Sequence, residues 1–480
     1  MAEATATFTL PGLGEGEPGC VLHPRSVEEV SEALRGAWEA GASVRPWGGG
    51  TQMVLGHAIL PAPARVVDLT RLDRVVEHRP EDMTVTVQAG VRWGDLAARL
   101  GQAGHELPFD PPVLPEATVG GMTAVGLSGP RRFAYGRLRD WVLGVQVVRP
   151  DGTITRAGGR VVKNVSGYEL SKVYVGSLGT LGVITEVTFK TRPVAPSRRV
   201  AAVPLPGPRA LEAAVARIMD SPVEPAFLEA FWIGGRDGRK LHLETEPSAS
   251  KDDGGPARLV VEALGLAADD PRINLPWLLA GFEGTEGRTA WQHQEVRRLL
   301  EPLRTAEMEP LEGAAGGRGP AALPRDLREV LFRPTDPPWE AVHEALLAGH
   351  RLPLAGATGD GRAVFYASLM SDQVAGFLAF ARDVTERENA RFAAYTHAGN
   401  GGVALHVAGP PPALEAAGRA LLEEAARLGG SMVLRHGPPP VRQALPIWDP
   451  PPATLPLMRA LKEKLDPRRI LNPGRFVGGL

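Results

Sequence analysis

The glycine-rich run at residues 44–52 holds the first residues whose types and spacing could do chemistry. A short apolar strand leads into three consecutive glycines and then into Thr51, which has a hydroxyl side chain. Because glycine has no Cβ, such a run can adopt backbone conformations that other residues avoid. It can also point several backbone N–H groups into one concavity that binds an anion. The run therefore predicts a phosphate-binding loop, and a plain surface turn is the competing interpretation.

Two well-known nucleotide-binding loops do not match this run. A loop that binds nucleoside triphosphates needs a lysine after its last glycine, and Thr51 stands there. The dinucleotide-binding turn of a Rossmann fold needs spaced glycines that open a helix, whereas residues 53–56 contain no helix cap. The residues of the run by themselves leave its ligand open.

Two further segments are also rich in glycine. Residues 115–126 consist largely of Gly, Ala and Thr. This composition fits either a backbone packed closely against a flat or charged group or a helix packed tightly through small residues. Residues 176–182 place a glycine at every third position. Each segment alone is weak evidence, so the elements around them have to be considered.

The predicted secondary structure places two of these segments beside strands. Ser26 and Glu29 form a capping box ahead of a helix that Gly41 ends. A strand at residues 43–46 then leads into the first glycine run, and residues 183–190 alternate cleanly as a strand after the third. Further strands are predicted at residues 65–69, 84–87 and 141–148, and a short helix at residues 95–100.

Pro193 and Pro196 predict a domain boundary. Beyond them, helices and strands alternate with irregular insertions at residues 248–256 and 309–320, which predicts an α+β domain with an antiparallel sheet. The predicted strands lie at residues 227–233, 362–369 and 403–407, and the helices at residues 209–219, 289–303, 372–387, 412–428 and 455–465. We expect domains at residues 1–195 and 196–450 and a tail at residues 451–480.

Length, net charge and cysteine content exclude several classes of function for this protein. The chain has 480 residues and a formal net charge of −2, which gives no electrostatic case for binding nucleic acid or an anionic membrane. The single cysteine, Cys20, excludes an internal disulfide and a cysteine-ligated iron–sulfur cluster. The first residues have no basic region and no apolar region, so we expect no signal peptide, and no apolar run is long enough to span a membrane. We therefore expect a cytoplasmic protein without direct membrane insertion, with any membrane association made through partners.

Three segments in this order resemble a known family. Residues 45–52, 115–126 and 163–190 resemble the FAD-binding domain of the vanillyl-alcohol oxidase and p-cresol methylhydroxylase superfamily. The third segment is particularly similar to the smaller FAD-binding subunit of glycolate oxidase. The segment that starts at His397 and the tail residues 447–452 and 472–476 fit the same pattern.

The resemblance implies both a fold and a cofactor. The implied fold is α+β: a two-subdomain FAD-binding domain of the p-cresol methylhydroxylase type, then an α+β cap domain with an antiparallel sheet, and a tail that returns to the FAD domain. FAD should be bound non-covalently, because Thr51 stands where covalently flavinylated relatives have a histidine. The residues that the resemblance assigns to FAD are Arg45, Pro46, Trp47, Gly48, Gly49, Gly50, Thr51, Gln52, Pro115, Thr118, Gly120, Gly121, Gly136, Asp140, Gly182, Val183, Ile184, Asn472 and Arg475.

The resemblance further implies an FAD-dependent oxidoreductase that acts on glycolate or a similar 2-hydroxy acid such as D-lactate. His397 is then the candidate catalytic base, and Arg391 and Arg435 are candidates for holding the carboxylate. His397 and His406 could share a zinc ion, but the spacing of the sequence places no third ligand near them. We therefore expect no metal site. His406 also lies two residues later than the second histidine of related D-2-hydroxy-acid dehydrogenases.

Two other functions stay open at this point. The chain could be a sugar or lactone oxidase on the same fold, or a non-catalytic accessory subunit that holds FAD. Glycolate oxidase complexes pair their flavin subunits with an iron–sulfur subunit. We therefore expect a hetero-oligomer in which this chain lies beside a larger flavin subunit and an iron–sulfur subunit.

Overall fold

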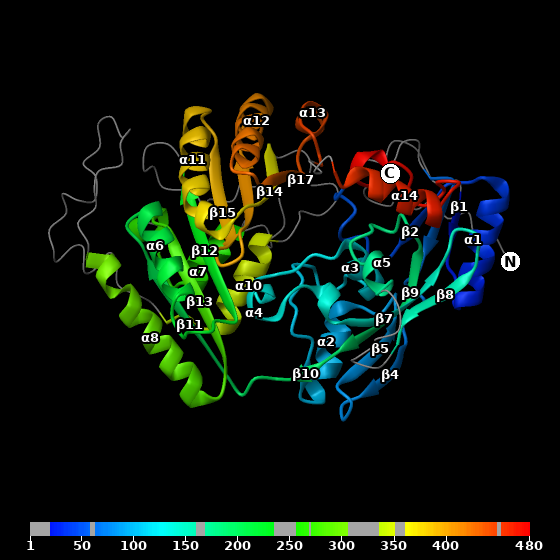
Figure 1. Ribbon diagram of the computed structural model, residues 1–480, viewed down its shortest axis with the longest axis horizontal. Helices are drawn as coiled ribbons and strands as arrows, with labels where there is room; N and C mark the ends of the chain where they lie inside the picture. Colours follow the sequence, from blue (N-terminus) through cyan, green and yellow to red (C-terminus); the bar gives the residue numbers. More distant parts are fainter. Residues whose placement is uncertain are drawn as a thin grey trace.

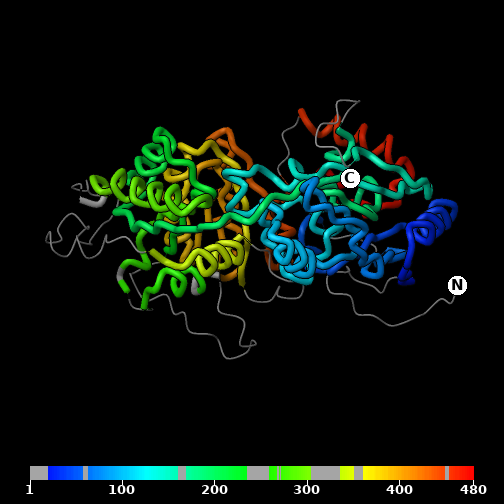
Figure 2. The backbone as a smooth tube through the Cα atoms, turned by 90° about the horizontal axis from the view of Figure 1, so that it is seen from below, coloured from blue at the N-terminus to red at the C-terminus, as the bar shows by residue number. Residues whose placement is uncertain are grey.

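The chain folds into two lobes in a computed structural model (Figures 1 and 2). The structure describes residues 20–57, 63–159, 169–234, 256–267, 270–305, 336–350, 361–448 and 453–480. Residues 163–168 of the third predicted FAD segment, residues 449–452 of the tail pattern, and nearly all of the two predicted insertions lie outside these ranges.

The first part of the N-terminal lobe is a small parallel sheet. Its strand order is β1 (Cys20–Leu22), β3 (Arg65–Asp68) and β2 (Val44–Trp47). Helix α1 (Val27–Ala40) begins where Ser26 Oγ accepts the N–H of Glu29 at 3.2 Å, and it ends at Gly41, which has a φ of 62°. The prediction that Ser26 begins this helix and Gly41 ends it is therefore confirmed. Strand β2 leads directly into the first glycine run.

The second part of this lobe is an antiparallel sheet of five strands. Its order is β4 (Val75–Arg79), β5 (Thr84–Gln88), β9 (Val183–Lys190), β7 (Val142–Val148) and β8 (Ile154–Gly158). The helices around it are α2 (Trp93–Gln102), α3 (Val119–Val125), α4 (Arg132–Tyr135), α5 (Ser171–Tyr174) and the short 3-10 helix η1 (Leu138–Asp140). The predicted strands at residues 84–87, 141–148 and 183–190 are confirmed to within a residue. Residues 115–126, for which we left two interpretations open, include helix α3.

The C-terminal lobe is built on one antiparallel sheet of seven strands. In spatial order these are β11 (Ser197–Pro204), β13 (Trp277–Gly284), β12 (Phe227–Gly234), β15 (Arg391–His397), β16 (Gly402–Ala408), β14 (Arg362–Ser368) and β17 (Ser431–His436). The prediction of an α+β lobe with an antiparallel sheet is confirmed. Strands β11, β13, β15 and β17 were not predicted. β13 is a largely apolar run buried on both faces, so it lacks the alternation that marks a strand in sequence.

The two faces of this sheet are covered differently. Helices α6 (Pro208–Met219), α8 (Glu286–Thr305), α11 (Val374–Arg387) and α12 (Pro411–Arg427) cover one face through a core that includes Leu228, Phe365 and Leu405. Helices α7 (Pro256–Ala263) and α10 (Trp339–His350) cover part of the other face, around Phe231 and Tyr395. In Figure 1 α10 and α4 lie where the two lobes meet. This second face therefore looks toward the N-terminal lobe.

The C-terminal tail returns to the N-terminal lobe. Helices α13 (Pro439–Ala444) and α14 (Leu455–Leu465) precede it, and the red end of the chain lies near β2 and α1 in Figure 1. The N–H of Asn472 donates to the carbonyl of Val44 at 2.9 Å, and the N–H of Val44 donates to that of Ile470 at 2.7 Å. The tail thereby extends the small sheet at β2. The division at residues 195 and 450 stays a prediction about domain boundaries.

Candidate cofactor pocket and active site

The first two glycine-rich segments pack directly against each other. A Cβ atom on Gly48 would collide with Thr118 Oγ1, and one on Gly49 would lie 2.5 Å from the carbonyl oxygen of Glu116. Thr118 is also the N-cap of α3, where its hydroxyl accepts the N–H of Gly121 at 3.4 Å. The glycines after β2 are therefore needed for the loop to lie against the segment that opens α3.

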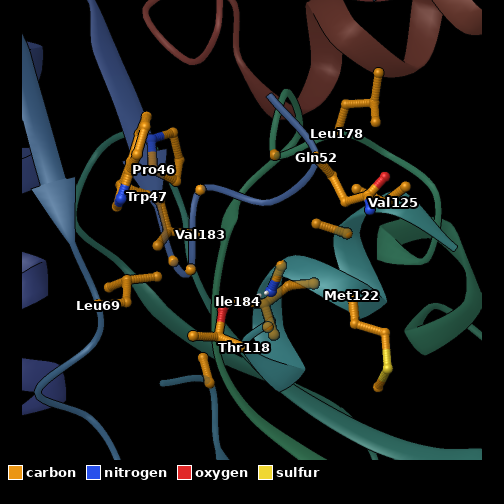
Figure 3. A pocket seen from close by; sticks show the side chains of 18 of the residues that line it. Pro46, Trp47, Gln52, Leu69, Thr118, Met122, Val125, Leu178, Val183 and Ile184 are labelled. Atoms are coloured by element: carbon orange, nitrogen blue, oxygen red, sulfur yellow. Dashed lines mark hydrogen bonds between the residues drawn. The ribbon is translucent and has the colours of Figure 1, made fainter. Parts of the chain in front are cut away.

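These segments, the turn before β9 and the C-terminal tail enclose a pocket with about 710 Å³ of empty space. Figure 3 shows Pro46 and Trp47 on one side of it and Met122 and Val125 of α3 on the other. The lining is mostly apolar, with a few polar groups, as is usual for sites that bind flat organic ligands.

Several polar atoms in this pocket lack a partner. Both side-chain polar atoms of Gln52 and Oδ1 of Asn472 are buried and form no hydrogen bond with any described residue. Buried polar atoms in proteins are nearly always satisfied, so these point to a ligand with hydrogen-bonding groups. The pocket therefore fits a cofactor that carries both phosphates and a ring system. The glycine loop could hold the phosphates, and the apolar lining and the unpartnered polar atoms could hold the ring system.

Most of the residues predicted to bind the cofactor line this pocket. They are Pro46, Trp47, Gly48, Gly49, Gly50, Thr51, Gln52, Thr118, Gly120, Gly121, Gly182, Val183, Ile184, Asn472 and Arg475.

Four predicted residues are not among the residues that line it. Arg45 is buried in β2, beside the lining residue Pro46. Pro115 packs against Gly94 of α2. Asp140 is exposed, and its Oδ2 accepts the N–H of Arg137 at 2.8 Å, while Gly136 takes the φ of 77° that this turn requires. The Gly136–Asp140 turn thus has a local structural reason for its residue types.

Sequence reasoning missed eight lining residues. They are Met53, Leu69, Ala89, Met122, Ala124, Val125, Leu178 and Gly179. Leu69 follows β3, and only the parallel pairing of β3 with β2 brings it beside the glycine loop. The apolar side chains of α3 could have been expected from its small-residue composition, had the helical interpretation been chosen.

The tail residues line the pocket and also hold its walls. Arg475 donates from Nε to the carbonyl of Leu55 and from Nη2 to that of Gln52, both at 3.2 Å. Burial, with a smaller effect from Arg45, lowers the pKa of Arg475 to about 10. Asn472 donates from Nδ2 to the carbonyl of Leu178 at 2.8 Å. Both residues therefore fix backbone that forms the pocket.

A second group of candidate functional side chains lies on the sheet face that looks toward this pocket. His397 ends β15, directly opposite Glu229 of β12. His397 Nδ1 forms a hydrogen bond with Glu229 Oε1 at 2.7 Å, and His350 Nε2 forms one with Glu229 Oε2 at 2.9 Å. All three side chains are buried. Burial raises the pKa of Glu229 and lowers the pKa values of His350 and His397.

This group is also the place where a metal could be considered. Glu229, His350 and His397 each offer one ligand atom, and these atoms lie within 4.8 Å of one another. The residue types suit zinc, but one nitrogen of each imidazole and both carboxylate oxygens take part in hydrogen bonds within the group. His406 does not join it, because its Nε2–H donates to the carbonyl of Gly349 at 2.6 Å. The alternative zinc pair of His397 and His406 is therefore not brought together here, whereas Glu229, His350 and His397 are.

Two arginines approach the same region from different lobes. Arg132 of α4 donates from Nη1 to the hydroxyl of Tyr366 at 3.1 Å, and the guanidinium of Arg435 lies 3.6 Å from the centre of the Tyr366 ring. Arg435 is the extra residue of a β-bulge between β14 and β17, a feature that often re-aims side chains at active sites. Burial lowers the pKa of Arg435 to about 10. Neither arginine forms a salt bridge with a carboxylate of the described chain.

The two arginines predicted to bind the substrate carboxylate lie in different places. Arg435 lies beside Tyr366, as described, whereas Arg391 is exposed at the opposite end of β15 from His397. Arg391 lies six positions before His397 along the strand, which corresponds to about 20 Å. The structure therefore rules out a shared site for Arg391 and His397. Sequence spacing favoured neither arginine, and Arg132 of the other lobe was missed altogether.

The arginines and His397 are close to the cofactor pocket. Val364 of β14 packs with Leu55 and Leu178 of the pocket region, and Tyr366 lies two residues further along the same face of the strand. A Cβ atom on Gly402 would collide with the Tyr366 hydroxyl and lie 2.8 Å from Cδ2 of His397. The Tyr366 hydroxyl and the His397 ring are therefore neighbours, on the side of the sheet that faces the pocket.

A two-part FAD-binding lobe followed by a cap lobe with an antiparallel sheet defines a flavoprotein of the p-cresol methylhydroxylase fold class. Residues 18–158 match the FAD binding domain family, and residues 194–476 match the family described as FAD linked oxidases, C-terminal domain. The chain belongs to the FAD-linked oxidases, and its cofactor is FAD. It is an FAD-linked oxidoreductase of the glycolate oxidase and D-lactate dehydrogenase type.

Relatives of this type match most of the chain. The mitochondrial D-lactate dehydrogenase [cytochrome] of Arabidopsis thaliana is 26% identical over 96% of this chain and 73% of its own length. Glycolate oxidase subunit GlcD of Bacillus subtilis is 27% identical over 96% of this chain and 89% of its own. Glycolate oxidase subunit GlcE of Escherichia coli is 36% identical, but over only 38% of this chain and 55% of its own. The expected resemblance is confirmed, and its longest matches include GlcD.

Solved structures confirm the fold class. A p-cresol methylhydroxylase structure with substrate bound has a TM-score of 0.63 and 18% identity, and covers 98% of this chain and 91% of its own. An alkyldihydroxyacetonephosphate synthase structure has a TM-score of 0.65 and 19% identity, and covers 96% of this chain and 78% of its own. Across the described ranges, none of the helices combines the length and apolar character needed to cross a membrane.

Proposed function

We propose that this chain oxidises a small 2-hydroxy acid of the glycolate or D-lactate kind. The observation that supports this most directly is a pair of arginines, Arg132 and Arg435, beside a buried histidine; neither arginine has a carboxylate partner among the described residues. Bound FAD supplies the chemistry of accepting a hydride from the carbon that carries the hydroxyl group. The protein must then hold the substrate carboxylate and remove the hydroxyl proton.

The carboxylate is held by Arg132 and Arg435 in this proposal. Both guanidinium groups flank Tyr366, and charge-assisted hydrogen bonds to a carboxylate are about twice as strong as neutral ones. The two arginines come from different lobes, so a substrate between them would lie at the lobe junction. A neutral sugar or lactone would leave both cations uncompensated, which disfavours the sugar oxidase alternative.

His397 is the base in this proposal. Its Nδ1 is engaged by Glu229, and its Nε2 is buried without any hydrogen-bond partner in the described chain. Burial keeps the pKa of His397 well below its ordinary value of 6.5, so the imidazole is neutral at neutral pH. A neutral imidazole with a free Nε2 lone pair can accept the hydroxyl proton of the substrate.

Reduction of the bound flavin under anaerobic conditions tests this function. We expect glycolate or D-lactate to bleach the flavin of the purified holoprotein. Arg435→Met should weaken substrate binding about 10- to 100-fold, because it removes a hydrogen bond to a charged group. Arg391→Met is the matched control, since it removes an exposed arginine at the far end of β15. Equal effects of the two variants, or no bleaching by any 2-hydroxy acid, would contradict the proposal. Absence of bleaching would favour the accessory role instead.

We also propose that the electrons leave through a partner protein. Cys20 is the single cysteine, so the chain cannot ligate an iron–sulfur cluster through cysteines. Two of its relatives are named as subunits of glycolate oxidase, and another is named with a cytochrome. We expect a second flavin subunit and an iron–sulfur subunit to be recovered with the chain. Pull-down from the native host followed by iron analysis tests this, and isolation of the chain alone with fast turnover on oxygen would contradict it.

A further inference from the structure

We propose that Glu229 is a positioning residue that fixes His397 in one tautomer, with the proton on Nδ1 and the lone pair on Nε2. Nothing in the sequence pattern singles out Glu229, which lies 168 residues before His397. The tautomer itself is a property of the folded chain. Only its consequence for catalysis rests on the function proposed above.

The geometry around Glu229 leaves one arrangement of protons once its carboxyl group is ionised. Its side chain is completely buried, with one oxygen 2.7 Å from His397 Nδ1 and the other 2.9 Å from His350 Nε2. The proposal includes an ionised Glu229, although burial raises its pKa, with Arg132 acting in the opposite direction. An ionised carboxylate only accepts hydrogen bonds, so both imidazoles then donate to it. His397 therefore carries its proton on Nδ1, and His350 carries its proton on Nε2.

His350 holds the carboxylate in place from the other side. It lies at the end of α10, and its ring stacks on that of His397 with 4.1 Å between centres and 14° between planes. With one imidazole on each oxygen, the Glu229 carboxylate cannot rotate without losing a hydrogen bond in a buried site. His350 thus acts on His397 through Glu229 and through the stacked ring.

The opposite tautomer would be inactive in the proposed reaction. Nδ1 of His397 faces Glu229, so only Nε2 can meet a substrate. A proton on Nε2 would remove the lone pair that has to accept the hydroxyl proton. After the proton transfer, His397 is an imidazolium, and the adjacent carboxylate stabilises that charge.

Charged and titratable groups surround this cluster. They are Asp110 in the loop after β6 (His105–Glu106), Arg132 on α4, Tyr366 on β14, Tyr395 on β15, His406 on β16 and Arg435 on β17. Arg132 and Arg435 disfavour protonation of the two histidines, whereas an ionised Glu229 would favour it. Removing the Glu229 charge should therefore lower the pKa of His397.

Nitrogen NMR of the wild-type holoprotein tests the tautomer without using activity. We expect the ring nitrogens of His397, in protein labelled with ¹⁵N-histidine, to show a protonated Nδ1 and an unprotonated Nε2 near neutral pH. The signals are assigned by their loss in His397→Gln. A protonated Nε2 in the wild type would overturn the proposal, whether or not any 2-hydroxy acid reduces the flavin.

Flavin reduction kinetics test the consequence of this tautomer. Glu229→Gln should slow reduction at saturating substrate at least about 100-fold, in line with the loss of a general base. The dissociation constant of the substrate should change by less than about 3-fold, and the acidic limb of the rate profile should move to lower pH. Glu283→Gln, which removes another buried carboxylate of the same lobe, is the control. The proposal fails if Glu229→Gln slows reduction no more than Glu283→Gln does, or if the acidic limb stays in place in the FAD-loaded variant.

Variants of His350 separate its hydrogen bond from its packing. His350→Gln keeps an N–H donor for Glu229, and we expect a rate within about 3-fold of the wild type. His350→Leu keeps bulk but cannot donate, and we expect a loss of about 10-fold, which is the size of one hydrogen bond. Equal rates in the two variants would show that His350 does not hold the carboxylate through its hydrogen bond.

Discussion

Replacing Lys462 by methionine should destabilise the N-terminal lobe more than any surface change on the same helix. Lys462 lies on α14 with a side chain only 1% exposed. Its Nζ donates to Asp466 Oδ2 at 2.7 Å, to the carbonyl of Thr180 at 2.7 Å and to that of Leu471 at 3.0 Å. The bond to Thr180 joins α14 to the turn before β9, which forms part of the cofactor pocket, and the other two bonds hold the tail that follows the helix.

The size of the effect follows from what the substitution leaves behind. Methionine keeps the apolar stem of Lys462 but leaves Asp466, which is fully buried, without its cation. Breaking one side of a buried ion pair typically costs about 3–5 kcal/mol. For a lobe of about 150–250 residues, each kcal/mol lowers the unfolding midpoint by about 2–4 °C, so we expect a drop of about 6–20 °C. FAD should also be released more easily, because Asn472 of the tail lines its pocket.

Calorimetry and the rise of flavin fluorescence on heating measure this effect. Lys464→Met is the matched control, because Lys464 is exposed on the same helix. We expect the control to unfold and release flavin within about 2 °C of the wild type, as is usual for surface substitutions. If Lys462→Met behaved like Lys464→Met, the reasoning that the buried ion pair anchors the tail would be wrong.

Three further predictions concern the pocket and the cap. Gly49→Ala should weaken FAD binding about 10-fold or more, because the added Cβ would lie 2.5 Å from a backbone carbonyl oxygen. A fluorescence titration measures this affinity. Gly101→Ala is the control and should leave the affinity unchanged, because a Cβ there meets nothing within 4 Å. Since no described lining residue is a His, Cys or Tyr, acid precipitation should release all the flavin, and a coloured pellet would disprove non-covalent binding. Burial lowers the pKa of His406 from 6.5 to about 4. Between these two pH values the His406 imidazole is protonated in the unfolded chain but neutral in the folded chain. The free energy of unfolding should therefore decrease as the pH falls from 6.5 toward 4. The thermal midpoint should drop more between about pH 7 and about pH 5 in the wild type than in His406→Asn.

Much of the cofactor pocket could be predicted from the sequence because its parts have local signals. The three glycines after β2 and the capping residues of α1 reflect backbone requirements of their own neighbourhoods, and β9 shows clean alternation. The resemblance then joined these segments into one FAD site. It assigned Gly136 and Asp140 to the cofactor as well, and that assignment stays a prediction; both residues also have a role in a local turn.

The active-site group could not be predicted in the same way, because its members meet only through the order and register of the seven-stranded sheet. Glu229 stands opposite His397 because β12 pairs with β15, and His350 reaches Glu229 across 121 residues of sequence. Arg435 is aimed at Tyr366 by a bulge, which leaves no periodic signal in the sequence.

The sequence by itself determined the class of cofactor, the antiparallel cap and the histidine at the end of β15. The tertiary structure decided which carboxylate orients that histidine and which arginines lie beside it. The physical reason is that glycine runs, caps and alternation express constraints between neighbouring residues. Hydrogen bonds between Glu229, His350 and His397 depend instead on strand pairing and helix packing that only the folded chain creates.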